Sequence, residues 1–488
     1  MFNTLIKNRY FLKIFIIIFI FFGNLSAQKG YNINKKYPPS ALKQDASILK
    51  DVILKMHPSI GIYHSKTYYE DLFDKLTNSF TDSLTEKEFR IRLKSAMNQL
   101  HCGHSEIFLS KAYSKVIKPM KLNWLPYYFL AINNKLYSIM PVNSKKDSAI
   151  KSGSEILKIN KISADSILNY SRRMISADGY IETGKNLSIR YGINYFYPSL
   201  FGRPDSFLIE SKKNDSIQIQ YVKACNLKDL PVLPIGIRED SLLHKHKRAN
   251  INEGYVGNDK ELFVLKIRSF KSSRYKKIYR RTFRTLRKNK IENLVIDLRN
   301  NGGGNLSNSY RLLKYLMETE QTITLKTHVK NYPYRKYTKG NITFKFTKYA
   351  LKKMGTKKIN GDSISYIQKI KPYKKEHYTG KLYVLINGGT FSASCIVAAY
   401  LKNNKNATLI GRETGGTNEG CNAGITPYYT LPNTKLKVRI PAFRIIHDID
   451  PALTGHGILP NHEIKYSFED ILKRRDLEMK FVKDLIKK

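Results

Sequence analysis

The chain of 488 residues has only four cysteines, which are Cys102, Cys225, Cys395 and Cys421. None of them belongs to a CxxC pair, so their spacing excludes the usual structural zinc sites. In an exported protein these thiols permit one or two disulfides, but the spacing does not reveal the pairing. The chain also lacks internal repeats, and no motif in it implies a metal or another cofactor.

Acidic residues are scarce: 39 Asp and Glu stand against 85 Lys and Arg, which gives a formal net charge of +46. Such a charge is typical of proteins that bind nucleic acid or an anionic membrane surface. Here the basic residues are spread along the whole chain, beside abundant Asn, Ile and Tyr. We therefore expect no nucleic-acid partner, whereas peripheral association with an acidic cell envelope stays open.

A long hydrophobic run is missing as well. The apolar run Ile14–Phe22 is short for a membrane span, which needs ~20 residues. It follows Lys7 and Lys13 and precedes Ser26-Ala27, a pattern that is typical of a secretory signal peptide. The sequence thus predicts cleavage after Ala27 and a mature protein in the periplasm, the cell envelope or the extracellular space. No lipidation cysteine follows.

The most informative stretch is Val384–Val397, in which an apolar strand ends at Gly388-Gly389 and a helix begins. This geometry places Ser392 in the first turn of the helix, where free backbone N–H groups favour developing negative charge. The alternative is that Ser392 or Ser394 only caps the helix. Cys395 lies one turn further in, which favours a buried structural cysteine over a nucleophile.

A second glycine turn stands at Leu294–Asn305, again between an apolar strand and a helix. Its glycines Gly302-Gly303-Gly304 can bring backbone N–H groups close to a ligand, as an oxyanion hole requires. A glycine triplet alone is often only a tight loop, but two such turns can face one pocket.

A third feature is His104. Thr85 and Glu88 form a capping box, and the apolar stripe of the helix that follows ends at Gly103. His104 therefore lies just beyond a helix end, where a lone histidine is usually structural or exposed.

With these motifs the sequence resembles the tail-specific (C-terminal processing) protease and tricorn-core family of serine peptidases. The resemblance rests on the D-x-R-x-N-x-G-G turn at Asp297 and the S-A-S helix start at Ser392, and it runs from about Asp51 to the C-terminus. It implies an α/β fold: a crotonase/ClpP-like core domain with an N-terminal helical segment and an inserted PDZ-like β-domain.

The resemblance also divides the chain. The alternating strands and the Ser148–Ile162 pattern match the second half of a PDZ domain; a generic small β-domain is the alternative. The predicted segments are a signal peptide (1–27), a helical segment with the G-H-S turn (28–117), a PDZ-like domain (118–228), a linker (229–259) and the peptidase core (260–488).

The resemblance implies roles for individual residues. Ser392 is the nucleophile, and the backbone N–H groups of Ala393 and of Gly302 or Gly303 form the oxyanion hole. Asp297 and Arg299 are expected to shape their turn rather than to do chemistry.

The base departs from the bacterial pattern, because the loop that should carry a lysine has Thr417 in its place. An unassisted serine is a weak nucleophile, so another base is required. The tricorn-like branch uses histidine, which here corresponds to His104. Asp450 is the first choice for the acidic residue that orients this histidine, and Asp448 is the second. His447, His456 and His462 are the fallback bases.

Other patterns predict elements of the core. They include helices at 274–288 and 307–317, a mostly parallel sheet, a long edge strand at 435–445, a substrate-covering insertion at 322–378 and a tail helix at 468–486.

The resulting hypothesis is an exported serine endopeptidase that cleaves polypeptides with exposed C-termini through an acyl-enzyme, by a Ser/His rather than a Ser/Lys mechanism. A first alternative is a catalytically inactive relative that binds peptides through the PDZ-like domain, which the missing lysine favours. A second alternative is an envelope structural protein that acts through its basic surface.

Overall fold

The computed structural model describes residues 30–118, 120, 122–141, 150–226, 243–256, 261–327, 356–360, 363–404, 406–449 and 453–487. The predicted signal peptide, Asp450 and much of the predicted insertion lie outside these ranges. Within them, no helix has both the length and the apolar composition that a membrane crossing requires.

The N-terminal segment is helical, as predicted, with α2 (Pro39–Met56), α3 (Lys66–Asn78) and α4 (Glu86–Asn98). The capping box is present: the Thr85 side chain accepts from the backbone of Glu88, and the Glu88 side chain accepts from that of Thr85. Short elements flank these helices: β1 (Lys36–Tyr37), β2 (Leu84–Thr85), β3 (Glu106–Phe108) and α5 (Lys111–Ile117).

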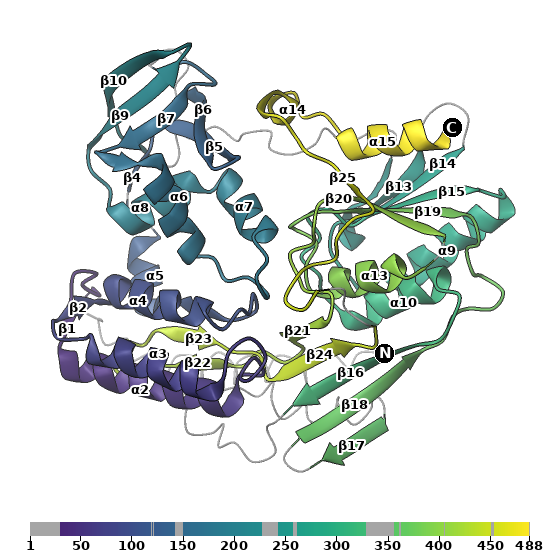
Figure 1. Cartoon of the computed structure of the whole chain (residues 1–488), viewed down its shortest axis with the longest axis horizontal. Coiled ribbons are helices and arrows are strands. Elements are labelled where there is room, and N and C mark those ends of the chain that lie inside the picture. Colours follow the sequence, from purple (N-terminus) through teal and green to yellow (C-terminus); the bar gives the residue numbers. More distant parts are fainter. Residues whose placement is uncertain are drawn as a thin grey trace, which may run out of the picture.

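The core of this segment includes residues from the other end of the chain. β3 pairs with β23 (Lys437–Arg439), which pairs with β22 (Tyr428–Thr430). Leu436 and Val438 are buried together with apolar residues of α2 and α4. In Figure 1 these yellow-green strands run beside the purple N-terminal helices. The helical segment therefore needs the C-terminal half of the chain to complete its core.

A β-domain follows, with its own hydrophobic core between Leu125 and Val222. Its main sheet has the order β10-β9-β7-β6-β5, and β8 pairs with β7. The strands are β5 (Tyr127–Ile132), β6 (Lys135–Pro141), β7 (Glu155–Ile159), β8 (Ile162–Ser163), β9 (Ser206–Lys213) and β10 (Ser216–Lys223). Helices α6 (Ala164–Arg173), α7 (Thr183–Arg190) and α8 (Ile193–Phe201) accompany them, and β4 (Asn123–Trp124) pairs with β11 (Cys225–Asn226).

The largest sheet has the order β12-β13-β14-β15-β19-β20-β25. It is parallel from β14 to β25, so the prediction of a mostly parallel sheet is confirmed. Its strands are β12 (His244–His246), β13 (Ile251–Val256), β14 (Leu262–Ile267), β15 (Asn293–Asp297), β19 (Lys381–Ile386), β20 (Ala407–Gly411) and β25 (His462–Glu463); the 3₁₀ turn η2 (Lys247–Ala249) links the first two.

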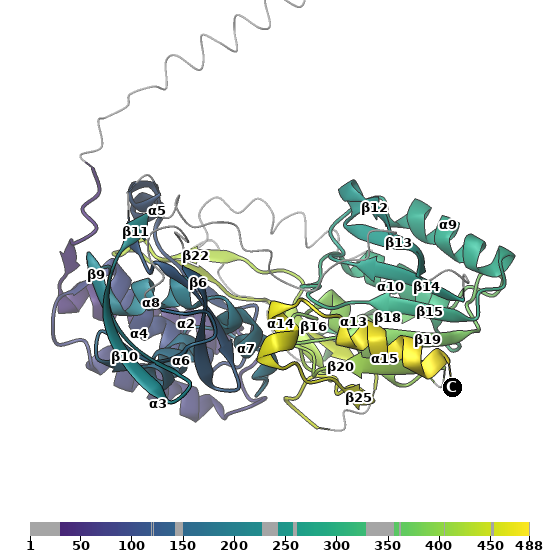
Figure 2. The ribbon, with the colours of Figure 1, turned by 90° about the horizontal axis from the view of Figure 1, so that it is seen from above.

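Helices cover both faces of this sheet. α9 (Tyr275–Lys288), α10 (Leu306–Leu316) and α13 (Ala393–Lys402) pack against one face, where Ile296 and Val384 point. The alternate residues Val295 and Leu385 contact the C-terminal helix α15 (Leu477–Ile486) on the other face. Figures 1 and 2 show α15 lying across the strands.

A second sheet, of order β17-β18-β16-β24-β21, lies beside the core (Figure 1). Its strands are β16 (Gln321–Thr327), β17 (Thr356–Asn360), β18 (Ser363–Ile370), β21 (Gly420–Ala423) and β24 (Phe443–His447). Part of the predicted insertion at 322–378 thus consists of regular strands.

Three sequence-based boundaries were wrong. The predicted linker at 229–259 contains β12 and β13, which belong to the core sheet. The predicted edge strand at 435–445 is two strands, β23 and β24, in different sheets, because Pro441 lies between them and lacks an N–H for pairing. The predicted tail helix is interrupted after α14 (Phe468–Leu472).

Candidate active site

The two glycine turns meet at one edge of the large sheet. β15 and β19 are parallel neighbours, so the segments after them leave the sheet at the same edge. The Asn387 side chain joins them: its Oδ1 accepts from the backbone N–H of Asn300 at 2.9 Å, and its Nδ2 donates to Asn300 Oδ1 at 3.1 Å. The Phe391 N–H donates to Asn301 O at 3.0 Å.

Gly303 lies directly against the serine turn. A Cβ atom at this position would lie 2.8 Å from Phe391 O, 2.8 Å from Ser392 Cβ and 2.9 Å from Ala393 N. Its φ of +90° is also unfavourable for other residues. A glycine is therefore required here both for space and for backbone conformation.

Ser392 precedes the first residue of α13 and has a strained backbone, with φ 57° and ψ −123°. Its side chain does not cap the helix. Ser394 takes the structural role instead: its hydroxyl accepts from the Phe391 N–H at 2.8 Å and donates to backbone carbonyls of the two turns. The strain holds the Ser392 hydroxyl away from the helix.

His104 lies beside this hydroxyl, because the loop after α4 brings it to the serine turn. Its Nε2 is 3.2 Å from Ser392 Oγ, and its ring stacks on Phe391 with ring centres 4.6 Å apart. Burial lowers the pKa of His104 to about 4, and the nearby Arg439 acts in the same direction. The imidazole is therefore neutral at pH 7, and its ring can accept a proton.

The backbone around Ser392 offers hydrogen-bond donors. Within the described residues, the N–H groups of Ala393 and Gly302 have no acceptor, whereas the Gly303 N–H donates to Asn301 Oδ1 at 2.9 Å. Of the two glycines, Gly302 thus has the available donor. Ala393 directly follows Ser392, and Gly302 adjoins Gly303, which packs against the serine turn. Free backbone N–H groups are the donors that an oxyanion hole requires.

Comparisons with known proteins found one family match and several similar solved structures. Residues 261–464 match the sequence model of Peptidase family S41. This match indicates a serine peptidase, whose substrates are polypeptides. No curated protein matches the sequence.

Solved structures have a similar fold. The structure of mature CPAF is 13% identical, covers 92% of this chain and 96% of its own, and has a TM-score of 0.61. Mature CPAF complexed with lactacystin gives 13% identity, coverage of 92% and 97%, and a TM-score of 0.62. At this identity the likeness establishes the shared α/β fold with its several sheets and nothing about activity.

The other predicted site residues do not join Ser392 in the described structure. Thr417 is buried, and its hydroxyl donates to Gly420 O. Asp450 lies outside the described residues, and the side chain of Asp448 is exposed and makes no hydrogen bond with His104. The Nδ1 atom of His104 is buried, and the described residues offer it no partner.

The fallback histidines are also elsewhere. His447 is buried and bonds through Nδ1 to Asn418 O at 2.7 Å. His456 lies 3.6 Å from Glu413, and His462 is exposed. Among the described side chains only His104 forms a hydrogen bond with Ser392.

Sequence reasoning missed Asp178. This buried carboxyl accepts the Gly103 N–H at 2.7 Å and thereby holds the turn that carries His104. Its second oxygen is buried without a partner in the described structure. Burial raises the pKa of Asp178 to about 7, although the Gly103 hydrogen bond and Arg444 act against it. An isolated aspartate between two elements gives no periodic signal by which it could have been found.

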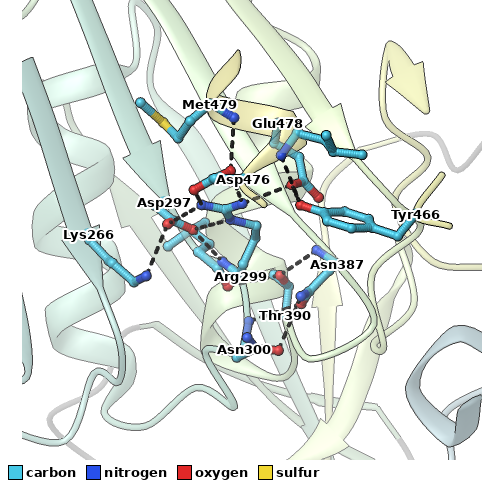
Figure 3. A network of polar contacts seen from close by, with 12 residues as sticks. Lys266, Asp297, Arg299, Asn300, Asn387, Thr390, Tyr466, Asp476, Glu478 and Met479 are labelled. Carbon is cyan, nitrogen blue, oxygen red and sulfur yellow. Dashed lines mark hydrogen bonds and ion pairs between the residues drawn. The ribbon is translucent and has the colours of Figure 1, made fainter. Parts of the chain in front are cut away.

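Arg299, at the start of the first glycine turn, is the centre of a buried ion network (Figure 3). Its guanidinium donates to both oxygens of Asp297 at 3.0 and 2.8 Å and to both oxygens of Asp476 at 2.7 and 2.9 Å. It also donates to Glu478 at 2.9 Å, and Lys266 lies 3.5 Å from Asp297.

This network explains how α15 is attached. Burial alone would lower the pKa of Arg299, but the carboxylates of Asp297 and Asp476 raise it well above its ordinary value. The turn before the glycines is thus fixed to the C-terminal helix. Sequence analysis recognised the tail as helical but had no signal that its acidic residues reach Arg299.

All four cysteines lie in the described residues and are free thiols. Cys395 is buried, donates to Thr390 O at 2.9 Å, and has a pKa that burial raises to about 12. A thiol in this state is a poor nucleophile.

Proposed function

We propose that this protein is an exported serine endopeptidase that cleaves polypeptides through an acyl-enzyme, with Ser392 as nucleophile and His104 as general base. The 3.2 Å contact between His104 Nε2 and Ser392 Oγ carries the proposal. His104 thus provides the base that the loop at Thr417 lacks. It lies beside the hydroxyl of Ser392 in the strained turn.

The chemistry follows from this geometry. His104, neutral above a pKa of about 4, takes the hydroxyl proton as Ser392 Oγ attacks the scissile carbonyl. The N–H groups of Ala393 and Gly302 bind the oxyanion, and His104 then protonates the leaving amine. Water, activated by the same imidazole, hydrolyses the acyl-enzyme.

Asp450, which lies outside the described residues, stays the residue proposed to orient His104. The Nδ1 atom of His104 is buried, and the described residues offer it no partner. A carboxylate there would fix the tautomer and stabilise the imidazolium that forms during attack. Asp450→Asn should therefore reduce kcat, but less than His104→Ala, because the nucleophile and the base remain.

The β-domain at 118–228 is proposed to be PDZ-like and to bind extended peptide ends. Its separate hydrophobic core and its antiparallel sheet with the exposed edge strand β10 support this assignment. The parallel sheet between helical layers supports a crotonase/ClpP-like core. If the excised β-domain is folded but binds no member of a C-terminal peptide library, the recognition role is wrong.

Export is proposed from residues 1–27, which lie outside the described structure. Mass spectrometry of the native N-terminus tests it: a chain that begins at Gln28 supports cleavage after Ala27, and a cytosolic chain that begins at Met1 contradicts it.

Two observations favour the inactive alternative: the lysine missing from the loop at Thr417, and the buried Nδ1 of His104 without a partner in the described residues. A fluorophosphonate probe separates the two functions, since it labels an activated serine and leaves an unactivated serine unmodified. We expect labelling of the native protein, and competition by lactacystin, the compound found with mature CPAF.

Ser392→Ala should abolish labelling and cleavage, and His104→Ala should reduce both by a factor of ~10²–10⁴, the usual contribution of a general base. Matched controls are Ser307→Ala, an exposed serine at the other glycine turn, and His456→Ala. The rate should fall as the pH drops through the His104 pKa of about 4. Full activity in His104→Ala would disprove the Ser/His mechanism.

A further inference from the structure

A cavity of about 360 Å³ lies next to the glycine turns but apart from the reacting groups. Its walls come from α7 of the β-domain, from Asn300 and Asn387 of the two turns, and from the C-terminal segment around Tyr466 and α14. Neither Ser392 nor His104 lines it. The cavity therefore lies between two parts of the chain and touches the residues that join the turns.

Two arginines of the cavity wall have guanidinium groups that lack hydrogen-bond partners in the described structure. Within the described residues, the side chain of Arg190 makes no hydrogen bond or ion pair, and Arg412 Nε has no hydrogen-bond acceptor. The nearest carboxylate to Arg412, that of Glu463, is 3.8 Å from Nε. Burial lowers the pKa of Arg190, and the charge of Arg412 acts in the same direction.

The acidic residues of the cavity wall already have hydrogen-bond and ion-pair partners. Asp470 pairs with Arg475 at 2.8 Å and accepts from Ser467, whereas Glu478 binds Arg299 and Tyr466. Neither carboxylate forms an ion pair with Arg190 in the described structure, although the charge of Glu478 raises the Arg190 pKa from a longer distance. A partly buried guanidinium without a direct ion pair is costly, and an incoming anion would reduce that cost.

We propose that this cavity binds a small organic anion through Arg190 and Arg412. The ligand chemistry is a carboxylate or a phosphate group, because the planar fork of a guanidinium matches both with paired hydrogen bonds. The size of the cavity suits a molecule of metabolite dimensions. This site is additional to the proposed peptidase function and does not depend on it.

Binding there would connect the β-domain to the catalytic turns. α7 already packs on the serine turn, since a Cβ atom at Gly388 would lie 2.4 Å from the backbone of Thr183. An anion held by Arg190 of α7 and by Arg412, which follows β20, would bridge the two parts. It would lie beside the Asn300–Asn387 pair that fixes the turns to each other.

The test is calorimetric titration of the full mature chain carrying Ser392→Ala, with inorganic phosphate and citrate as separate titrants at constant ionic strength. Because this variant is catalytically silent, the result is independent of whether the protein is a peptidase. We expect saturable binding of one anion per chain, and the better titrant shows whether phosphate or carboxylate is preferred. The melting temperature should rise with the concentration of that anion.

Arg190→Gln and Arg412→Gln should each weaken binding by ~10-fold or more, the loss expected for a charge-assisted hydrogen bond. Arg190→Lys keeps the charge without the fork and should give an intermediate affinity. The matched control is Arg475→Gln, which lines the same cavity but is paired with Asp470; it should bind like the parent. Absence of binding by either anion, or equal binding by the folded Arg190→Gln and Arg412→Gln variants, would overturn the proposal.

Discussion

The Arg299 network and the Ser392 site lie at the two ends of one glycine turn, and they differ in whether their charged and polar groups have partners. Around Arg299 each charged group has a partner of opposite sign, and the guanidinium binds three carboxylates. Around Ser392 and His104 the polar groups are buried with few partners: His104 Nδ1 and one oxygen of Asp178 have none in the described structure. Matched charges hold the turn in shape, while groups without partners remain available to exchange protons or contact a ligand.

The comparison also shows why the two regions respond differently to substitution. Removing one member of a buried ion pair leaves the others uncompensated, which costs about 3–5 kcal/mol of stability. Removing a reactive group that has few partners costs little stability and changes the rate instead. The following predictions start with the largest expected effect on stability.

Arg299→Met should lower the free energy of unfolding by about 3–5 kcal/mol, because Glu478 would remain buried without its cation and Asp297 would keep only Lys266. Urea denaturation measures this change. Arg287→Met on α9 is the control, since its guanidinium is exposed and contacts only the carbonyl of Lys375; we expect a change within ~0.5 kcal/mol. A loss below ~1 kcal/mol in Arg299→Met would show that the network does not hold the turn.

Asp178→Asn should change how stability depends on pH. The pKa of Asp178 rises from 3.8 to about 7 on folding, so between these values the folded state binds more protons than the unfolded state. Its contribution is therefore complete below pH 3.8 and is lost as the pH rises through 7, by about 4 kcal/mol in all. The asparagine variant lacks this loss.

His57, His104 and His447 have lowered pKa values of about 3, 4 and 4, so their contributions have the opposite sign and are lost on acidification below 6.5. The difference between wild type and Asp178→Asn isolates the aspartate, because the histidines are common to both. Unfolding in urea from pH 4 to pH 8 gives this difference, and a value that is constant across the range would refute the raised pKa.

Tyr466→Phe should have the smallest effect of the three. The Tyr466 hydroxyl donates to Glu478, and Phe would remove this bond while Arg299 still compensates the carboxylate. We expect a loss of about 1.5–3 kcal/mol, the usual value for a hydrogen bond to a charged group. Tyr221→Phe, which alters an exposed tyrosine of β10, provides the baseline. If Tyr466→Phe lowers the free energy of unfolding no more than Tyr221→Phe does, then only the ion pairs stabilise the network.

Much of the fold was predictable because it depends on local pattern. The helix predicted at 274–288, the helix predicted at 307–317 and the capping box at Thr85 were found close to the expected positions, since periodicity and cap chemistry are properties of neighbouring residues. The strand that became β23 and β24 was mispredicted as one element, although Pro441 carried a visible signal. The assignment of β12 and β13 to the core sheet had no such local signal, because it rests on pairing with β14.

By itself, then, the sequence determined the two glycine turns, the helix that begins after Ser392 and the loop that carries His104, because glycine conformation and helix capping act over a few residues. Only the tertiary structure decided that His104 meets Ser392 across 288 positions of chain, that Arg299 meets Asp476 across 177, and that Arg190 and Arg412 share a cavity. The physical reason is that burial and the matching of charges depend on which surfaces pack together, and no local pattern records that.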